Sequence, residues 1–185
     1  QTVCVGASVT LAGTGVDTYT WDNSVVDNTA FTAVNATNAS ITTTYTMTAT
    51  DGNGCTSSDQ VAVTVEPTPI IANTVDTICS VGTFNVTPAN GSGNTVPSGT
   101  TYSWSAPSVT GITGTASGSS ATSITGTLTN TTNAAIVVNY MVTPTSGTCV
   151  GTAFSLAVTV NPVPSVIAQT AASCSGSAFT LAPTN

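Results

Sequence analysis

Residues 44–69 read TYTMTATDGNGCTSSDQVAVTVEPTP. Apolar residues alternate with Thr before the central Asp-Gly-Asn-Gly segment, and Val alternates with other residues after it. Alternation with a period of two is typical of half-buried β-strands, and Asp-Gly-Asn-Gly between two such runs is typical of a hairpin turn. The closing Pro-Thr-Pro cannot continue a ladder, because proline has no N–H to donate. The stretch therefore predicts two antiparallel strands, a turn at residues 51–54 and a break at Pro67.

The same pattern recurs along the chain as part of a longer repeat. The repeated blocks are VCVGASVTLAGTG at 3–15, matched at 78–91 and 173–185; TYTWDNS at 18–24, matched at 101–107; and residues 44–69, matched at 139–164. Blocks that recur in the same order indicate tandem modules.

The positions of the blocks set the expected boundaries. We expect module 1 over residues 1–67, module 2 over residues 68–163 and the incomplete start of a third module over residues 164–185, with one strand at 179–182. Pro-x-Pro joints stiffen each linker toward an extended form.

The composition of the 185-residue chain excludes several classes of partner. It has no Lys, Arg or His and seven acidic residues, which give a formal charge of −7. A chain without cations cannot neutralise phosphates, and anionic membrane surfaces repel it. No apolar run is long enough to cross a membrane. We therefore expect no nucleic-acid partner and no membrane insertion. Because Thr and Val favour strands and helical periodicity is absent, the expected fold is all-β, with tandem antiparallel β-sandwich modules joined by short Pro-containing linkers.

Each complete module has one Cys near its start and one that enters its final strand. Repetition therefore predicts the disulfides Cys4–Cys55 and Cys79–Cys149, and it leaves Cys174 unpaired or with a partner outside the chain. Loops of this length should stabilise each module by roughly 4 kcal/mol. Zinc would need closely spaced Cys or His, and a reactive thiolate would need a nearby cation, so structural disulfides are the preferred interpretation. Disulfides indicate a compartment outside the cytoplasm.

The order Cys…Tyr-x-Trp…Tyr…Cys…Val-x-Val-x-Val-x-Pro resembles the PKD-like and immunoglobulin-like repeats of large Bacteroidota surface proteins. The residues that carry the resemblance are Cys4, Tyr19, Trp21, Tyr45, 51–55, Val61, Val63 and Val65 in module 1, and Cys79, Tyr102, Trp104, Tyr140 and Cys149 in module 2. Module 2 lacks the Asp-Gly-Asn-Gly turn. The resemblance implies a seven-stranded sandwich, export by type IX secretion, and roles as adhesins, filaments or spacer modules.

Four aromatic residues are expected in the cores: Trp21, Trp104, Tyr45 and Tyr140. Each Trp lies between the two cysteines of its module, where a sandwich places its core Trp. A sugar-stacking platform at the two Trp residues is the alternative.

Two kinds of surface site have weaker support. Calcium prefers carboxylate and carbonyl oxygens, which could come from Asp22, Asp27, Asp51 and Asp59. No loop has the dense acidic pattern of a dedicated calcium site, so solvated turn residues and no cofactor are expected. Asp76-Thr77-Ile78 resembles an O-glycan acceptor motif of Bacteroidota, which makes Thr77 the candidate glycan site. Asn-x-Ser/Thr triplets, as at Asn35, carry little information in a Thr-rich bacterial chain.

Together these features predict a non-catalytic, structural and adhesive repeat region of an exported bacterial cell-surface protein or extracellular fibre. No catalytic residues are expected, since no His, Lys or Arg is available to tune a pair of carboxylates. The expected partners are neighbouring repeat modules or identical subunits in a fibre, and surface glycans. The alternative function is a carbohydrate-binding accessory region of a secreted enzyme.

Overall fold

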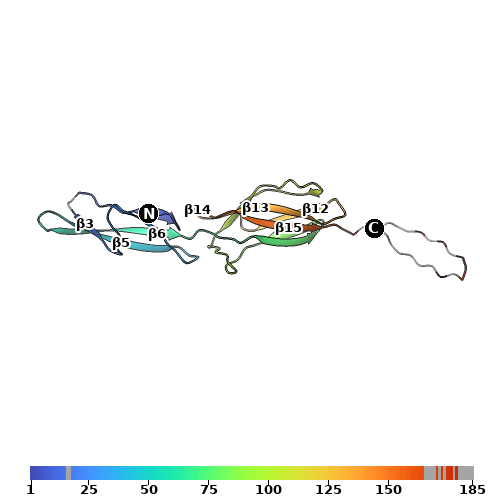
Figure 1. Cartoon of the computed structure of the whole chain (residues 1–185), viewed down its shortest axis with the longest axis horizontal. Helices are drawn as coiled ribbons and strands as arrows, with labels where there is room; N and C mark the ends of the chain where they lie inside the picture. The colour runs from blue at the N-terminus through green and yellow to red at the C-terminus, as the bar shows by residue number, and fades with distance from the viewer. Residues whose placement is uncertain (16–17, 165–169, 171, 173, 177, 179–185) are drawn as a thin grey trace.

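The computed structural model describes residues 1–15, 18–164, 170, 172, 174–176 and 178, and its strands form two bodies that lie end to end (Figure 1). One body holds the strands between residues 2 and 66, and the other holds those between residues 74 and 161. We keep the names module 1 and module 2 for them. The described residues form strands and turns and no helix, so the expected all-β sandwich class is confirmed. The strand expected at 179–182 lies outside the described residues.

Module 1 consists of a four-stranded sheet, in the order β1-β6-β5-β3, and a pair formed by β2 and β4. Its strands are β1 (Thr2–Cys4), β2 (Ser8–Thr10), β3 (Thr18–Trp21), β4 (Ala30–Thr32), β5 (Ile41–Thr50) and β6 (Thr56–Glu66). β5 and β6 form one long hairpin, paired from Ile41↔Val65 to Thr50↔Thr56. The residues between them make the turn expected at 51–54, which is therefore confirmed.

Module 2 repeats this arrangement with additional short strands. Its strands are β7 (Thr74–Cys79), β8 (Gly82–Val86), β9 (Thr101–Trp104), β10 (Ile112–Thr113), β11 (Gly118–Ala121), β12 (Ile124–Asn130), β13 (Ile136–Ser146), β14 (Cys149–Val150) and β15 (Phe154–Asn161). One sheet has the order β11-β9-β13-β15-β7, with β14 paired to β13, and the other has the order β10-β12-β8. β10 and β11 come from an insertion between the strands that correspond to β3 and β4.

The first strand of each module runs parallel to the last one, which the sequence did not indicate. β1 pairs with β6, so that Cys4 lies opposite Glu66, the last residue of β6. β7 pairs in the same way with β15, so that Cys79 lies opposite Asn161. The other strand pairs are antiparallel. This parallel register determines where the cysteines lie.

The period of two along the strands produces one apolar core in each module. Fourteen buried residues form the core of module 2, including Leu156, Val158 and Val160, which are fully buried on alternate positions of β15. Five buried residues form the core of module 1, including Val63 and Val65 of β6. Apolar burial is the main stabilising term in folding, so module 1 depends more strongly on other constraints than module 2 does.

Candidate functional site

Two of the described acidic side chains, those of Asp27 and Asp51, accept hydrogen bonds from groups close to them. Among the described residues, no group of three or more His, Cys, Asp or Glu side chains is placed to hold a metal ion. Asp27 Oδ1 accepts hydrogen bonds of 2.8 Å from Trp21 Nε1 and from the Gly13 backbone. Asp51 Oδ1 accepts two 2.9 Å bonds from backbone N–H groups of its own turn, at residues 53 and 55. These two carboxylates therefore fix local structure.

The one disulfide found in the described part of the chain joins the two modules. It links Cys4 to Cys149 across a sequence separation of 145, with the two Cα atoms 5.6 Å apart. Cys55, Cys79 and Cys174 are free thiols with exposed side chains. The expected bonds Cys4–Cys55 and Cys79–Cys149 therefore do not form, and that pairing is corrected.

Strand register explains why Cys4 cannot reach Cys55. Cys4 lies opposite the last residue of the 11-residue strand β6, whereas Cys55 precedes the first residue of the same strand. At about 3.3 Å per residue these positions are roughly 36 Å apart, and a disulfide needs Cα atoms within about 7 Å. Module 2 has the same geometry, because Cys79 lies opposite the end of β15 and Cys149 lies before its start. Each module therefore carries its two cysteines at opposite ends.

We call the contact region around this disulfide the module junction, formed by Val5, the loop at residues 35–39, the linker at residues 67–73, Thr95 and the segment at residues 144–151. Figure 1 shows it midway along the molecule, where β14 lies next to module 1. The linker prolines Pro67 and Pro69 are buried there. Gly151 is also buried, and a Cβ atom at this position would collide with the Pro69 carbonyl oxygen. The linker is thus packed between the modules.

Hydrogen bonds tie the linker to module 2. Ile70 and Thr95 exchange two backbone hydrogen bonds of 2.9 and 2.8 Å, and the Ala72 N–H donates to Asn94 Oδ1 over 2.8 Å. A linker held by its backbone and by buried prolines loses its freedom to bend. The sequence predicted the stiffness from the Pro-x-Pro spacing, and the structure adds the packing that enforces it.

Asn35 closes the module 1 side of the junction. Its Nδ2 group donates to the Val65 carbonyl over 2.9 Å and to the Ala39 carbonyl over 2.8 Å. Its Oδ1 accepts from the Thr37 backbone and hydroxyl, each at 2.8 Å. A small cavity of about 200 Å³ lies between this loop, the linker and Thr95. Sequence reasoning gave Asn35 no role, although the pentapeptide Asn-x-Thr-Asn-Ala at 35–39 recurs at 130–134 and could have indicated one.

The four expected core aromatics divide into two classes. Trp104 and Tyr140 are buried in the core of module 2, where burial raises the pKa of Tyr140 and also that of Tyr102. Trp21 and Tyr45 are half-buried and pack against the core of module 1. The position of each Trp relative to the cysteines therefore did not fix its burial.

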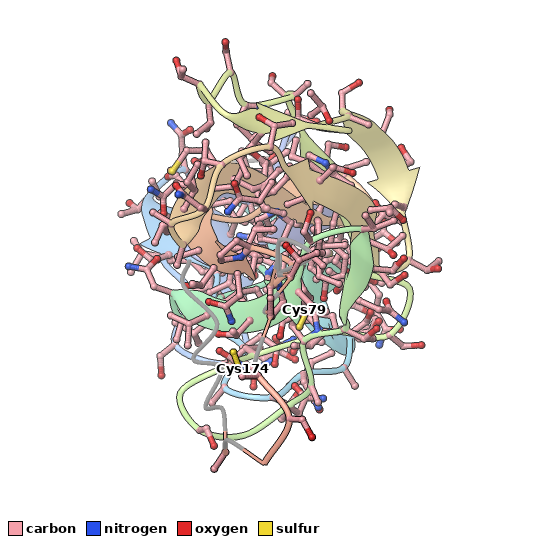
Figure 2. The ribbon with its side chains drawn as sticks, turned by 90° about the vertical axis from the view of Figure 1, so that its right-hand side faces the viewer. Cys79 and Cys174 are labelled. Atoms are coloured by element: carbon pink, nitrogen blue, oxygen red, sulfur yellow. A yellow bond between two sulfur atoms is a disulfide. The ribbon has the colours of Figure 1, made fainter. Side chains whose placement is uncertain are left out.

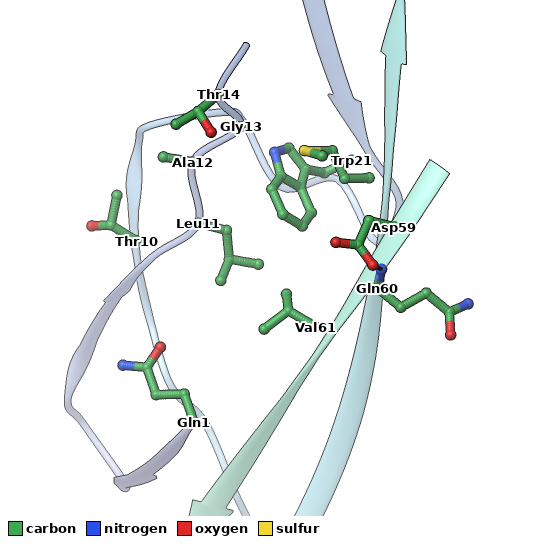
Figure 3. A pocket seen from close by; sticks show the side chains of 11 residues that line it. Gln1, Thr10, Leu11, Ala12, Gly13, Thr14, Trp21, Asp59, Gln60 and Val61 are labelled. Carbon is green, nitrogen blue, oxygen red and sulfur yellow. Dashed lines mark hydrogen bonds between the residues drawn. The ribbon is translucent and has the colours of Figure 1, made fainter. Parts of the chain in front are cut away.

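A cavity of about 480 Å³ opens beside Trp21 (Figure 3). Polar side chains of Gln1, Thr10, Asp59 and Gln60 line it together with Leu11 and Val61. In module 2 the insertion changes the corresponding place, because Gly118 of β11 packs directly against the Trp104 ring. Among the described residues of module 1 no strand corresponds to β11, and its indole faces an open cavity.

Thr77 lies on β7, which forms the edge of the larger sheet of module 2, and its side chain is exposed. Its backbone N–H donates to Asp76 Oδ1 over 2.7 Å. An exposed hydroxyl on an edge strand is accessible to a modifying enzyme, which is compatible with an O-glycan at Thr77. The glycan itself stays a prediction.

Comparison with known proteins gives a family match and several structural neighbours. Residues 76–164, slightly less than half of the chain, match the family model of the PKD-like domain. Mouse cadherin-23 EC22–24 is 14% identical with a TM-score of 0.34, and the match covers 78% of this chain and 52% of that one. Sidekick-1 immunoglobulin domains 1–4 are 10% identical with a TM-score of 0.28, and the match covers 88% and 48% respectively.

This chain thus spans about half the length of those two structures. Comparison with curated proteins gives no match. In the portion that the structure describes, no helix has the length and apolar character needed to span a membrane. The family match coincides with the strands β7–β15. Residues 76–164 therefore match a PKD-like domain, and the strands in this part of the chain form the sheets of module 2.

Proposed function

We propose that this chain is a non-catalytic, rod-forming repeat region of an exported bacterial cell-surface protein or extracellular fibre, which holds adhesive parts away from the cell. The observation that carries the proposal is the module junction, where a disulfide and two buried prolines hold consecutive modules end to end. A spacer needs this fixed geometry, because a flexible linker would let the modules fold back on each other.

Several features support export. A disulfide between modules forms and persists in an oxidising compartment. The chain has no Lys, Arg or His, and its many Thr and Ser hydroxyls would accept O-glycans, with Thr77 as the first candidate. Type IX secretion follows from the resemblance to Bacteroidota repeats and belongs to the same proposal.

The free thiols supply a direct test of the rod. Cys55 lies at the outer end of module 1 and Cys79 at the outer end of module 2, and both are exposed. Spin labels on these two residues in a Cys174→Ser background should show a narrow distance distribution at about 80 Å, because each module separates its two cysteines by roughly 36 Å and the two Cα atoms of the disulfide are 5.6 Å apart. The matched control is the same labelled chain with Cys4→Ser and Cys149→Ser, in which the distribution should broaden. A broad distribution with the disulfide intact would contradict the rod.

A test on cells addresses export separately. Antibodies raised against module 2 should label intact cells of the producing organism, and protease added outside should remove the label. Label that appears after the cells are broken open, and not before, would refute the surface location.

The cavity beside Trp21 favours a second candidate function, binding of a carbohydrate. A half-buried indole surrounded by amide, hydroxyl and carboxylate groups is the kind of surface on which a sugar ring stacks and is oriented. Titration calorimetry with soluble oligosaccharides should show binding that Trp21→Phe weakens and that Trp104→Phe leaves unchanged, since Gly118 covers the second indole. Equal loss in both variants would remove this candidate.

A further inference from the structure

Module 2 ends in a second copy of the surface that module 1 uses to hold module 2. The backbone around Cys79 repeats that around Cys4. Val5 N donates to the Glu66 carbonyl over 3.0 Å, and Ser80 N donates to the Asn161 carbonyl over 2.7 Å. The residue two positions after each cysteine has a positive φ, +84° at Gly6 and +69° at Val81. A β-branched residue rarely adopts this conformation, so its presence at Val81 shows that the local geometry is enforced.

The Asn loop is duplicated as well. Asn130 Nδ2 donates to the Val160 carbonyl over 2.9 Å and to the Ala134 carbonyl over 2.7 Å, as Asn35 does to its own strand and loop. Asn130 Oδ1 accepts from the Thr132 backbone and hydroxyl at 2.9 and 2.8 Å. The loop that closes the module junction on one side is therefore also built at the outer end of module 2.

The two copies differ in what covers them. At the module junction, Pro67 and Pro69 are buried. At the outer end of module 2, Pro162 is half-buried, Val163 is 60% exposed and Pro164 is exposed. Figure 2 looks at the molecule from this end and shows Cys79 there, with no bond to Cys174. The surface is thus formed, and its residues 162–164 are more exposed than Pro67 and Pro69 are at the module junction.

Cys55 occupies the position that Cys149 has in module 2. Tyr45 pairs with Val61 and Tyr140 pairs with Leu156, which aligns the two long hairpins. Six residues after each Tyr, the chain meets the cysteine across the hairpin: Asp51 N donates to the Cys55 carbonyl over 3.0 Å, and Ser146 pairs with Cys149. Each module therefore presents one cysteine of this kind at its upstream end and one of the Cys4 kind at its downstream end.

We propose that the Cys4–Cys149 bond is one link of a ladder, in which Cys79 bonds to the hairpin cysteine of a further module of this type packed on the outer end of module 2. The inference rests on the proposed function and names the partner of this surface. The bond forms when the two thiols give up two protons and two electrons to the disulfide of a dithiol oxidant, which is reduced to two thiols. In the same way, Cys55 bonds to the cysteine of the Cys4 kind in a module upstream.

The test inserts a copy of residues 68–162 after Pro162 of the full chain, which reproduces the Pro-Thr-Pro joint. Peptic peptides mapped without reduction should show Cys79 bonded to Cys149 of the inserted copy. The chain then keeps three free thiols, as it has now at Cys55, Cys79 and Cys174. Cys79→Ser should raise the count to four by freeing the inserted Cys149, whereas the matched control Cys55→Ser should lower it to two and keep the new bond.

Two results would overturn the ladder. The first is five free thiols in the lengthened chain, and the second is Cys79 bonded to Cys55 or Cys174. Either result would show that the outer end of module 2 does not bind a further module in the way that module 1 binds module 2. The rod measurement on the unlengthened chain is independent of this outcome. A narrow label distance with five free thiols would support the proposed rod and refute the ladder. A broad label distance with a Cys79–Cys149 bond would support the ladder and refute the rod.

Discussion

Removal of the Cys4–Cys149 bond should weaken module 1 more than any other single change at the junction. Cys4→Ser and Cys149→Ser together remove the bond and leave no new thiol. When module 1 unfolds while module 2 stays folded, the bond closes a loop from Cys4 to the anchored Pro69, about 65 residues. Loop closure of that length contributes about 4 kcal/mol in the chain-entropy model. With five buried core residues, module 1 has little else to offset the loss.

Amide hydrogen exchange read by mass spectrometry follows the two modules in one sample. Exchange in β5 and β6 should accelerate about a thousandfold when the bond is removed, because each 1.4 kcal/mol corresponds to a factor of ten. The paired change Cys55→Ser and Cys79→Ser removes two thiols and no bond, so exchange should stay as in the parent chain. Unchanged exchange in β5 and β6 without the disulfide would refute this reasoning.

Three further predictions concern packing, hydrogen bonding and ionisation. Gly151→Val should push the linker away from module 2 at a cost of about 1–3 kcal/mol and speed reduction of the junction disulfide by added thiol, whereas Thr152→Val, at an exposed neighbour, should not. Asn130→Ala should lower the free energy of unfolding of module 2 by about 1–3 kcal/mol in urea titrations, because the buried Val160 carbonyl and the Ala134 carbonyl lose their donor. Unchanged stability would contradict the assigned bonds. Burial raises the pKa of Tyr102 and Tyr140, so module 2 should keep its full stability below pH 10 and lose stability as the pH rises above 10. Tyrosinate absorbance of these residues should rise together with unfolding. Their ionisation near pH 10 in protein that is still folded would contradict this prediction.

The sequence predicted the features that depend on local pattern. Alternation along residues 61–65 places Val63 and Val65 in the core, and the Asp-Gly-Asn-Gly segment makes the turn between β5 and β6. Period and turn chemistry are properties of neighbouring residues, so a single chain is enough to read them.

The sequence could not predict which cysteines pair. One pair of cysteines per repeat has the same period whether the bond lies within a module or between neighbours, so repetition alone cannot separate the two cases. The choice depends on the parallel register of β1 on β6, which puts Cys4 at the downstream end. Which strands pair depends on residues far apart in the sequence. The β-propensity of Thr and Val predicts a strand but does not predict its position in a sheet.

Similarly, alignment of Trp21 with Trp104 concealed their different surroundings. The insertion between β9 and β12 supplies Gly118, which covers one indole and has no counterpart over the other. Equivalent residues in two repeats therefore differ in exposure because of a segment that only one repeat contains.

The position of the Cys4–Cys149 bond also determines how the molecule carries mechanical load. Tension applied between Gln1 and Pro164 follows the covalent path to Cys4, crosses the sulfur atoms and continues from Cys149. The residues between those cysteines, 145 positions apart, lie off that path, and at about 3.4 Å each they represent roughly 490 Å of chain that a pull cannot draw out. Module 1 lies off this path from β2 to β6, so its unfolding adds no length. Resistance to stretching then depends on a covalent bond and on β1, β14 and β15, while the strands from β2 to β13 are free of load.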